Sequence, residues 1–109
     1  MKIGVSARDG SLDAAVEPRF GRCPDGVVVD SESMTFDAFA NEDAGGGGAG
    51  PRTVQAFASR GAQVILTGRV GPNAQEALQA ASLEVVTGVS GTVRQAVESY
   101  LKTKGVNQP

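Results

Sequence analysis

The chain has 109 residues, of which 40% are hydrophobic and 20% are charged, and its formal net charge is −2. This length and composition predict one globular domain at residues 1–104 with a frayed tail at 105–109, and the small negative charge argues against nucleic acid or an anionic membrane as a partner. The single cysteine, the lack of a signal-peptide pattern and the lack of an apolar run of about 20 residues predict a cytoplasmic protein, which we expect to be a monomer.

Five short β-type runs and three helical segments follow one another along the chain. Strands are predicted at 2–6, 26–31, 34–40, 62–68 and 83–88. Apolar residues at helical spacing predict helices around Val54, Ala74 and Val93. Pro51 and Pro72 stand in the first turns of two of these helices, where proline is tolerated.

The connections between these elements predict a mixed sheet. The second and third runs are separated by a short turn and must form an antiparallel hairpin, whereas helices link the third, fourth and fifth runs as parallel crossovers. The predicted fold class is therefore α/β: a five-stranded mixed sheet in the order 3-2-1-4-5, with the second strand antiparallel and helices on both faces. The carboxyl ends of the other four strands then share one edge, where ligands of open α/β sheets bind.

Four unusual loops should meet at that edge, and the first of them, at 7–25, contains the sequence RFGRC. Arg19 and Arg22 precede Cys23, the only cysteine. Nearby arginines favour the thiolate, and a loop position predicts partial exposure, so this residue is interpreted as a reactive or metal-binding thiol. The alternative is that Cys23 is a small buried hydrophobic residue.

The second loop, at 41–50, is dominated by glycine. It contains the GxGxxG pattern of dinucleotide-binding proteins, but four consecutive glycines satisfy that pattern almost automatically, and the preceding strand belongs to a hairpin. No Lys-Ser or Lys-Thr pair follows, as a P-loop would require. We expect residues 43–50 to be mobile without a ligand and able to close over one.

The third and fourth loops, at 67–72 and 87–92, repeat the pattern TGxxG at an offset of 20 residues: Thr67, Gly68 and Gly71 recur as Thr87, Gly88 and Gly91. Such glycines either satisfy tight turns or let backbone N–H groups at helix N-termini approach an anion. Both interpretations can hold at once.

The chain has no histidine, which removes most catalytic constellations. Neither Cys-His nor Ser-His-Asp catalysis can be built, and no Cys/His set exists for a structural zinc ion. The first strand carries no carboxylate for two-metal nuclease chemistry. The residues therefore exclude these two forms of nucleophilic catalysis, a structural zinc site and two-metal nuclease chemistry.

Two long segments, KIGVSARDGSLDAAVEPRFGRCP and GAGPRTVQAFASRGAQVILTGRVGPNAQEALQAASLEVVTGVSGTVRQAVESYL, resemble the two halves of the dinitrogenase iron-molybdenum cofactor biosynthesis family. The resemblance rests on the combination of RFGR, GAG, TGxxGxxA and GTVxxA. It implies a ribonuclease H-like fold and the non-catalytic binding, carriage or assembly of a metal-sulfur cluster. The implied cofactor is a molybdenum-copper sulfide cluster or a cluster of the iron-molybdenum cofactor type, held largely non-covalently, and the implied partners are cluster donor or acceptor proteins.

The residues themselves limit how such a cluster could be held. Relatives that bind their cofactor through a histidine offer no parallel here, and one thiolate cannot complete the coordination of a tetrahedral metal ion, so the remaining ligands must arrive as inorganic sulfide. Thiometallate clusters are anions, which arginine forks and helix N-termini stabilise. Six acidic residues also map to the predicted edge, so a count of charges does not by itself predict a positive pocket.

The predicted cluster-binding residues come from all four loops, with Cys23 as the one metal ligand. They are Arg19, Phe20, Gly21, Arg22, Cys23, Asn41, Gly47, Gly48, Gly50, Thr67, Gly68, Gly71, Thr87, Gly88, Gly91 and Thr92. Two other functions stay open: a small enzyme or sensor that binds a phosphorylated metabolite at the same edge, and an interaction module whose glycine-rich loop docks a partner protein.

Overall fold

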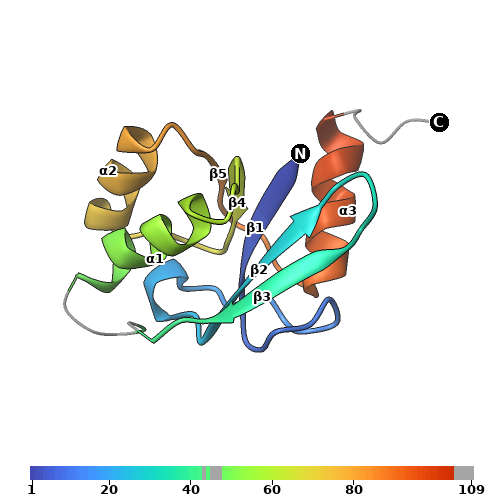
Figure 1. Cartoon of the computed structure of the whole chain (residues 1–109), viewed down its shortest axis with the longest axis horizontal. Helices are drawn as coiled ribbons and strands as arrows, with labels where there is room; N and C mark the ends of the chain where they lie inside the picture. The colour runs from blue at the N-terminus through green and yellow to red at the C-terminus, as the bar shows by residue number, and fades with distance from the viewer. Residues whose placement is uncertain (43, 45–47, 105–109) are drawn as a thin grey trace.

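A single five-stranded sheet is the centre of the computed structural model, which describes residues 1–42, 44 and 48–104 (Figure 1). The strands run in the order β3-β2-β1-β4-β5. β2 is antiparallel to both of its neighbours, and β1, β4 and β5 are parallel. The predicted sheet order and the antiparallel second strand are confirmed. The strand bounds are Lys2–Ala7 for β1, Asp25–Asp30 for β2, Phe36–Ala40 for β3, Val64–Leu66 for β4 and Glu84–Val86 for β5.

The third strand begins two residues later than predicted. Met34 has a positive φ of 60°, and its N–H donates to the Asp30 carbonyl oxygen at 2.8 Å. These features close the hairpin turn and keep residues 34 and 35 out of the strand. The turn lies at the opposite end of the sheet from the loops that follow β1, β3 and β4 (Figure 1).

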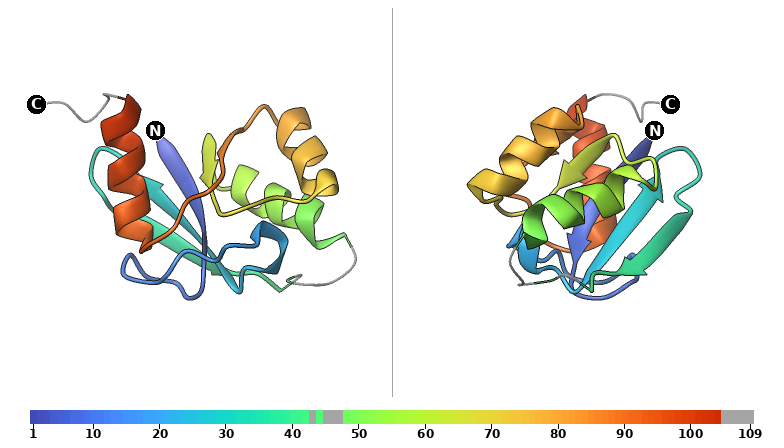
Figure 2. Two further views of the ribbon diagram at one scale, coloured as in Figure 1. Left: turned by 180° about the vertical axis from the view of Figure 1, so that it is seen from behind. Right: turned by 60° about the vertical axis from the view of Figure 1, so that its left-hand side comes forward.

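Helices cover both faces of the sheet, as predicted. α1 (Ala49–Ala58) and α2 (Pro72–Ala80) lie on one side, and α3 (Val93–Lys104) lies on the other (Figure 2). The alternation of residues along β1 explains the two layers, because Ile3 and Val5 pack in the core cluster beneath α3 while the intervening Gly4 faces α1. No helix in the described ranges is long and apolar enough to cross a membrane.

A group of aromatic rings joins the sheet to α1. A Cβ atom at Gly4 would lie 2.6 Å from Phe57 Cδ1, so glycine is needed for this ring to approach the strand. The Phe57 ring packs edge-on against Phe39, with centroids 5.1 Å apart, and stacks with Phe20 at 5.8 Å. Phe20 belongs to η1 (Phe20–Arg22), a 3-10 turn in the loop after β1. The aromatic group therefore anchors this turn next to α1.

Candidate functional site

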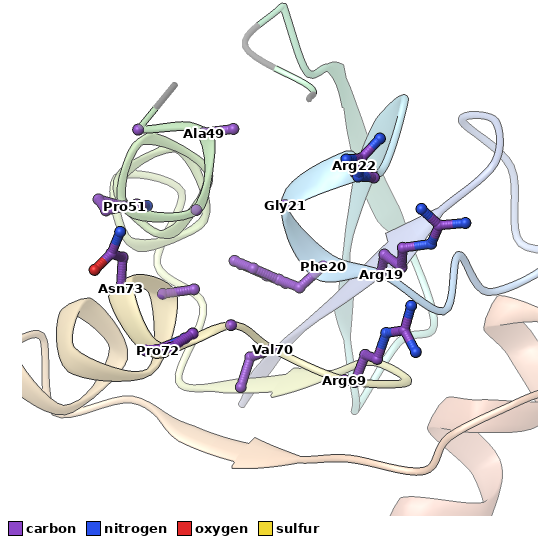
Figure 3. Close-up of a pocket in the computed structure, with 14 residues that line it drawn as sticks. Arg19, Phe20, Gly21, Arg22, Ala49, Pro51, Arg69, Val70, Pro72 and Asn73 are labelled. Carbon is purple, nitrogen blue, oxygen red and sulfur yellow. The ribbon is translucent and has the colours of Figure 1, made fainter. Parts of the chain in front are cut away.

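A pocket of about 390 Å³ opens where η1 meets the N-termini of α1 and α2 (Figure 3). Its volume lies within the range of about 300 to 1,000 Å³ found for small-molecule sites. The pocket has 14 lining residues, which come from three segments: 19–22, 48–51 and 69–74. Three of the four loops predicted to converge at this edge of the sheet thus contribute to it.

Two backbone hydrogen bonds join the loop after β1 to the loop after β4. The Phe20 N–H donates to the Arg69 carbonyl oxygen at 3.1 Å, and the Arg69 N–H donates to the Pro18 carbonyl oxygen at 2.7 Å. Gly68 permits this contact, because a Cβ atom there would lie 2.5 Å from the Pro18 oxygen. The pairing places the Arg19 and Arg69 side chains next to each other at the pocket (Figure 3).

The N-termini of α1 and α2 approach each other closely at Gly50. A Cβ atom on Gly50 would lie 2.9 Å from Ala74 Cβ, so this contact requires glycine. Phe20 is buried and points between the two helix ends, where its ring forms the floor of the pocket (Figure 3). The result is a shallow apolar floor beneath two neighbouring helix N-termini.

Neither helix end is closed by a capping side chain. The N-cap residues are Gly48 and Gly71, which have no side-chain oxygen, and neither first turn contains an acidic residue. Within the described residues, the N–H groups of Asn73 and Ala74 form no hydrogen bond. Since a helix N-terminus carries about half a positive charge, these ends favour an anionic ligand.

The side chains around the pocket add further positive charge. Arg19, Arg22 and Arg69 line it and are exposed, and no carboxylate is among its described lining residues. None of these three arginines forms an ion pair with a described residue. Two acidic residues from the predicted edge do not line the pocket and form ion pairs with other arginines: Glu17 with Arg8 at 3.7 Å, and Asp13 with Arg94 at 3.5 Å. The Glu17 carboxylate also accepts a hydrogen bond from the Arg19 backbone N–H at 3.0 Å. The pocket is therefore positive even though the chain is slightly negative.

The predicted exposure of Cys23 is wrong. This residue is fully buried, and burial raises the pKa of its thiol to about 11, although a hydrogen bond from Asn41 opposes the shift. The protonated thiol is thus the stable form at neutral pH, and Cys23 does not line the pocket. Asn41 is also buried, and its side chain binds Cys23 and Thr53 instead of facing the pocket. The predicted role of Cys23 as a metal ligand stays a prediction.

The structure brings together one part of the predicted set of site residues. Those that line the pocket are Arg19, Phe20, Gly21, Arg22, Gly48, Gly50 and Gly71. Thr67 is instead buried against Ser6, with 2.7 Å between the hydroxyl oxygens, and Gly68 packs on Pro18. Gly47 lies outside the described residues, as do 43, 45 and 46, so the predicted mobility of 43–50 falls largely outside them too.

The second TGxxG repeat serves the other face of the molecule. Thr87 and Gly88 line a separate groove between β5 and α3, and Thr92 caps α3. The Thr92 hydroxyl accepts a hydrogen bond from the Gln95 N–H at 3.1 Å, and the Gln95 side chain accepts one from the Thr92 N–H at 2.9 Å. This reciprocal capping box is visible in the sequence as Thr-x-x-Gln. The pattern could have shown that this loop does not belong to the predicted anion site.

Seven lining residues were absent from the predicted set: Ala49, Pro51, Arg69, Val70, Pro72, Asn73 and Ala74. The available sequence signal was Gly71 followed by Pro72, an N-cap without a side-chain oxygen and a proline at the first helical position. Arg69 is the most important of these additions for anion binding, because it is one of the three arginines that line the pocket.

No group of three or more His, Cys, Asp or Glu side chains in the described part of the chain could hold a metal ion. The pocket offers guanidinium groups, backbone N–H groups and an apolar floor. These groups suit a whole anion that arrives with its own inner ligands better than they suit a bare cation.

Comparisons with known proteins identify a family for the chain and two similar solved structures. The model of the family described as dinitrogenase iron-molybdenum cofactor matches residues 1–103. The apo form of the orange protein from Desulfovibrio gigas is 42% identical over 94% of this chain and 88% of that chain, with a TM-score of 0.87. A putative NifB protein from Thermotoga, of the DUF35 family, is 30% identical over 93% of this chain and 87% of that chain, with a TM-score of 0.82. No curated protein sequence matches the chain at a significant level.

Proposed function

The chain belongs to the dinitrogenase iron-molybdenum cofactor family, and from that premise we propose that its arginine-lined pocket binds an anionic metal-sulfur cluster, which the protein carries or helps to assemble without catalytic turnover. Family membership supports a role related to a metal cluster. The identity of the cluster is our proposal: a molybdenum-containing sulfide, with or without copper. The similar orange protein is described in an apo form, a term used for proteins that can release a bound group.

One observation carries this proposal, namely the concentration of positive charge among the described lining residues of the pocket. Three exposed arginines line one side of the pocket and two glycine-capped helix N-termini line the other, and the described lining residues include no carboxylate (Figure 3). Charged hydrogen bonds of this kind contribute about 1.5 to 3 kcal/mol each. An anion with several negative charges would contact all of these groups at once.

The apolar floor favours a sulfide-rich anion in particular. Phe20 and Val70 line the pocket, and Pro51 and Pro72 remove two backbone donors from the helix ends. Sulfide is larger and more polarisable than oxide, so it gains more from contact with apolar groups and loses less when water leaves. The arginines would bind and orient the cluster while the floor excludes water from one side of it.

The cluster would be held without a direct thiolate bond in this arrangement. Cys23 is buried and protonated, so we propose that the metals keep their own sulfide ligands and that the protein contributes charge compensation. Non-covalent retention suits transfer, because no metal-thiolate bond must break when the cluster passes between the protein and a donor or acceptor.

Reconstitution tests the proposal directly. The metal-free protein is titrated with tetrathiomolybdate and copper, desalted, and analysed for both metals and for visible absorbance. We expect molybdenum and copper to remain with the protein in a constant ratio. Arg22→Ala should weaken retention about ten- to a hundredfold, whereas the matched control Arg94→Ala, which loses the same charge from a residue paired with Asp13, should not. Equal losses in both variants, or no metal on the wild-type protein, would contradict the proposal.

The phosphorylated-metabolite alternative concerns the same pocket, since phosphate is also an anion. The described lining residues contain no lysine, serine or threonine, the side chains that commonly bind phosphate in addition to arginine. Inorganic phosphate added at millimolar concentration during the titration separates the two functions. A cluster site should keep its metals, and a phosphate site should release them.

A further inference from the structure

A buried polar cluster made of Cys23, Asn41 and Thr53 joins the two walls of the pocket. We call residues 19–22 the η1 wall and residues 48–51 the α1 wall. The Asn41 side-chain amide donates one hydrogen bond to the Cys23 carbonyl oxygen, directly after the η1 wall, and one to Thr53 Oγ1 in α1, each at 3.0 Å. Asn41 is 8% exposed and the other two residues are fully buried.

Thr53 extends this connection to the lining of the pocket. Its hydroxyl group accepts the bond from Asn41 and donates to the Ala49 carbonyl oxygen at 2.7 Å. Ala49 belongs to the α1 wall. A continuous chain of hydrogen bonds therefore runs from Cys23 through Asn41 and Thr53 to Ala49, and it links the two walls without entering the pocket.

The chemistry at position 41 requires asparagine. The amide nitrogen has two hydrogens, and each meets an oxygen acceptor at 3.0 Å, with Cys23 Sγ a further 3.6 Å contact. Aspartate has the same size but only acceptors when ionised, and leucine has neither donors nor acceptors. In the described residues no buried side-chain nitrogen or oxygen lacks a partner. Losing either donor of Asn41 would take one hydrogen bond from a buried oxygen, either that of the Cys23 carbonyl group or that of the Thr53 hydroxyl group.

We propose that Asn41 and Thr53 are positioning residues, which hold the η1 wall at a set distance from the α1 wall and thereby determine the size of anion that the pocket retains. The inference rests on the proposed function. A small guest must touch the arginines of one wall and the helix N-terminus of the other, so it depends on their separation more than a large guest does.

Two guests of different size test the proposal. Affinities for tetrathiomolybdate alone and for tetrathiomolybdate with copper are measured for the wild-type protein, Thr53→Val, Thr53→Ser and Tyr100→Phe. Thr53→Val should weaken binding of the smaller guest about tenfold and should weaken binding of the larger guest less. Thr53→Ser should restore the wild-type ratio of the two affinities, because it keeps the hydroxyl group. Tyr100→Phe is the control, since it removes one hydrogen bond to Glu84 on the α3 face, away from the pocket.

A second measurement needs no guest. Cys23 is fully buried, so a thiol reagent can reach it only when the η1 wall moves away from Asn41 or the whole protein unfolds. The two variants are compared under conditions that give them the same free energy of unfolding. The Cys23 thiol should then react about tenfold faster in Thr53→Val than in Tyr100→Phe. A Thr53→Val variant with the wild-type affinity ratio, or one that reacts no faster than Tyr100→Phe, would overturn the positioning role. If the wild-type protein binds neither guest, the proposed function fails, and the reaction rates alone decide whether these residues hold the walls together.

Discussion

The N-termini of α1 and α2 differ from that of α3 in what satisfies their backbone N–H groups. At α3, Thr92 and Gln95 form a reciprocal cap, and carbonyl oxygens of the loop after β1 accept the next two N–H groups, those of Val93 and Arg94, at 2.9 Å each. At α1 and α2 the cap residues are glycines, which supply no side-chain oxygen. The comparison teaches that helices leaving the same edge of a sheet can differ in how their first N–H groups are satisfied, because the cap residue decides whether a side chain accepts from them.

The difference also affects stability. A glycine cap is less favourable than a side-chain cap by roughly 0.3 kcal/mol, so two glycine-capped helix ends next to three arginines of like charge make the pocket a less stable region. A bound anion would remove this deficit and stabilise the folded state by mass action, by about 2.7 kcal/mol at a hundred times its Kd. Substitutions at the α1 and α2 ends should therefore change anion binding, and substitutions at the α3 end should not.

The largest effect is expected from removing arginines at the α1 and α2 ends. Replacing Arg22 and Arg69 together by alanine should weaken cluster retention by about 3 to 6 kcal/mol, more than a hundredfold, because each loses a charged hydrogen bond. Cys23→Ser should weaken it less than Arg22→Ala alone does, since the sulfur is buried and does not line the pocket. Metal analysis after desalting measures all three variants. Loss of binding in Cys23→Ser with full binding in Arg22→Ala would mean that the thiol is a ligand.

The buried thiol on the α1 side should make stability depend on alkaline pH. Burial raises the pKa of Cys23 from 9.0 to about 11, so folding favours the neutral thiol. This contribution is fully present below pH 9 and is lost as the pH rises through 11, for a total of about 2 to 3 kcal/mol. Urea unfolding from pH 8 to 11 measures it. Cys23→Ser serves as the control and should lack this part of the decline, so an identical decline in both proteins would contradict the prediction.

The close contact between the α1 and α2 ends should tolerate no added methyl group. Gly50→Ala places its Cβ atom 2.9 Å from Ala74 Cβ and should lower the free energy of unfolding by about 1 to 2 kcal/mol, even after the helix propensity gained. Gly71→Ala is the matched control, because a Cβ atom there meets nothing within 4 Å and its φ of −81° suits any residue. Thermal unfolding compares the two. Similar melting temperatures would show that the helix ends can separate at little cost.

Changing the cap residues of α2 and α3 should produce the smallest effects on the free energy of unfolding, with opposite signs at the two helices. Gly71→Asp supplies α2 with a capping carboxylate and should raise the free energy of unfolding by roughly 0.3 kcal/mol while weakening cluster binding, because the carboxylate occupies the N–H groups and repels the anion. Thr92→Ala removes the α3 cap and should cost about 1 kcal/mol without changing binding. Unfolding and metal-retention assays on both variants test the pair. Stronger cluster binding by Gly71→Asp would exclude the α2 end from the site.

The order of the elements and the connections between them made the strand order of the sheet predictable. The short turn before β3 and the helical crossovers after it restrict the strand order, because hairpins must be antiparallel and crossovers right-handed. Arg19, Arg22, Gly48 and Gly71 could be assigned to the site for the same reason, since each stands in a loop at the carboxyl edge. The family resemblance drew on these segments as well.

What the sequence by itself determined is thus the order of the strands, the edge where the loops gather and the residue types available there. Only the tertiary structure decided which loops share a pocket and which residues lie beneath it. Cys23 follows two arginines in sequence, yet Asn41, 18 residues away, helps to hold it in the interior. Similarly, Gly71 and Gly91 occupy equivalent places in a repeat, but only the former lines the pocket. The physical reason is that local spacing sets backbone geometry, whereas burial, capping and charge compensation depend on groups that arrive from distant parts of the chain.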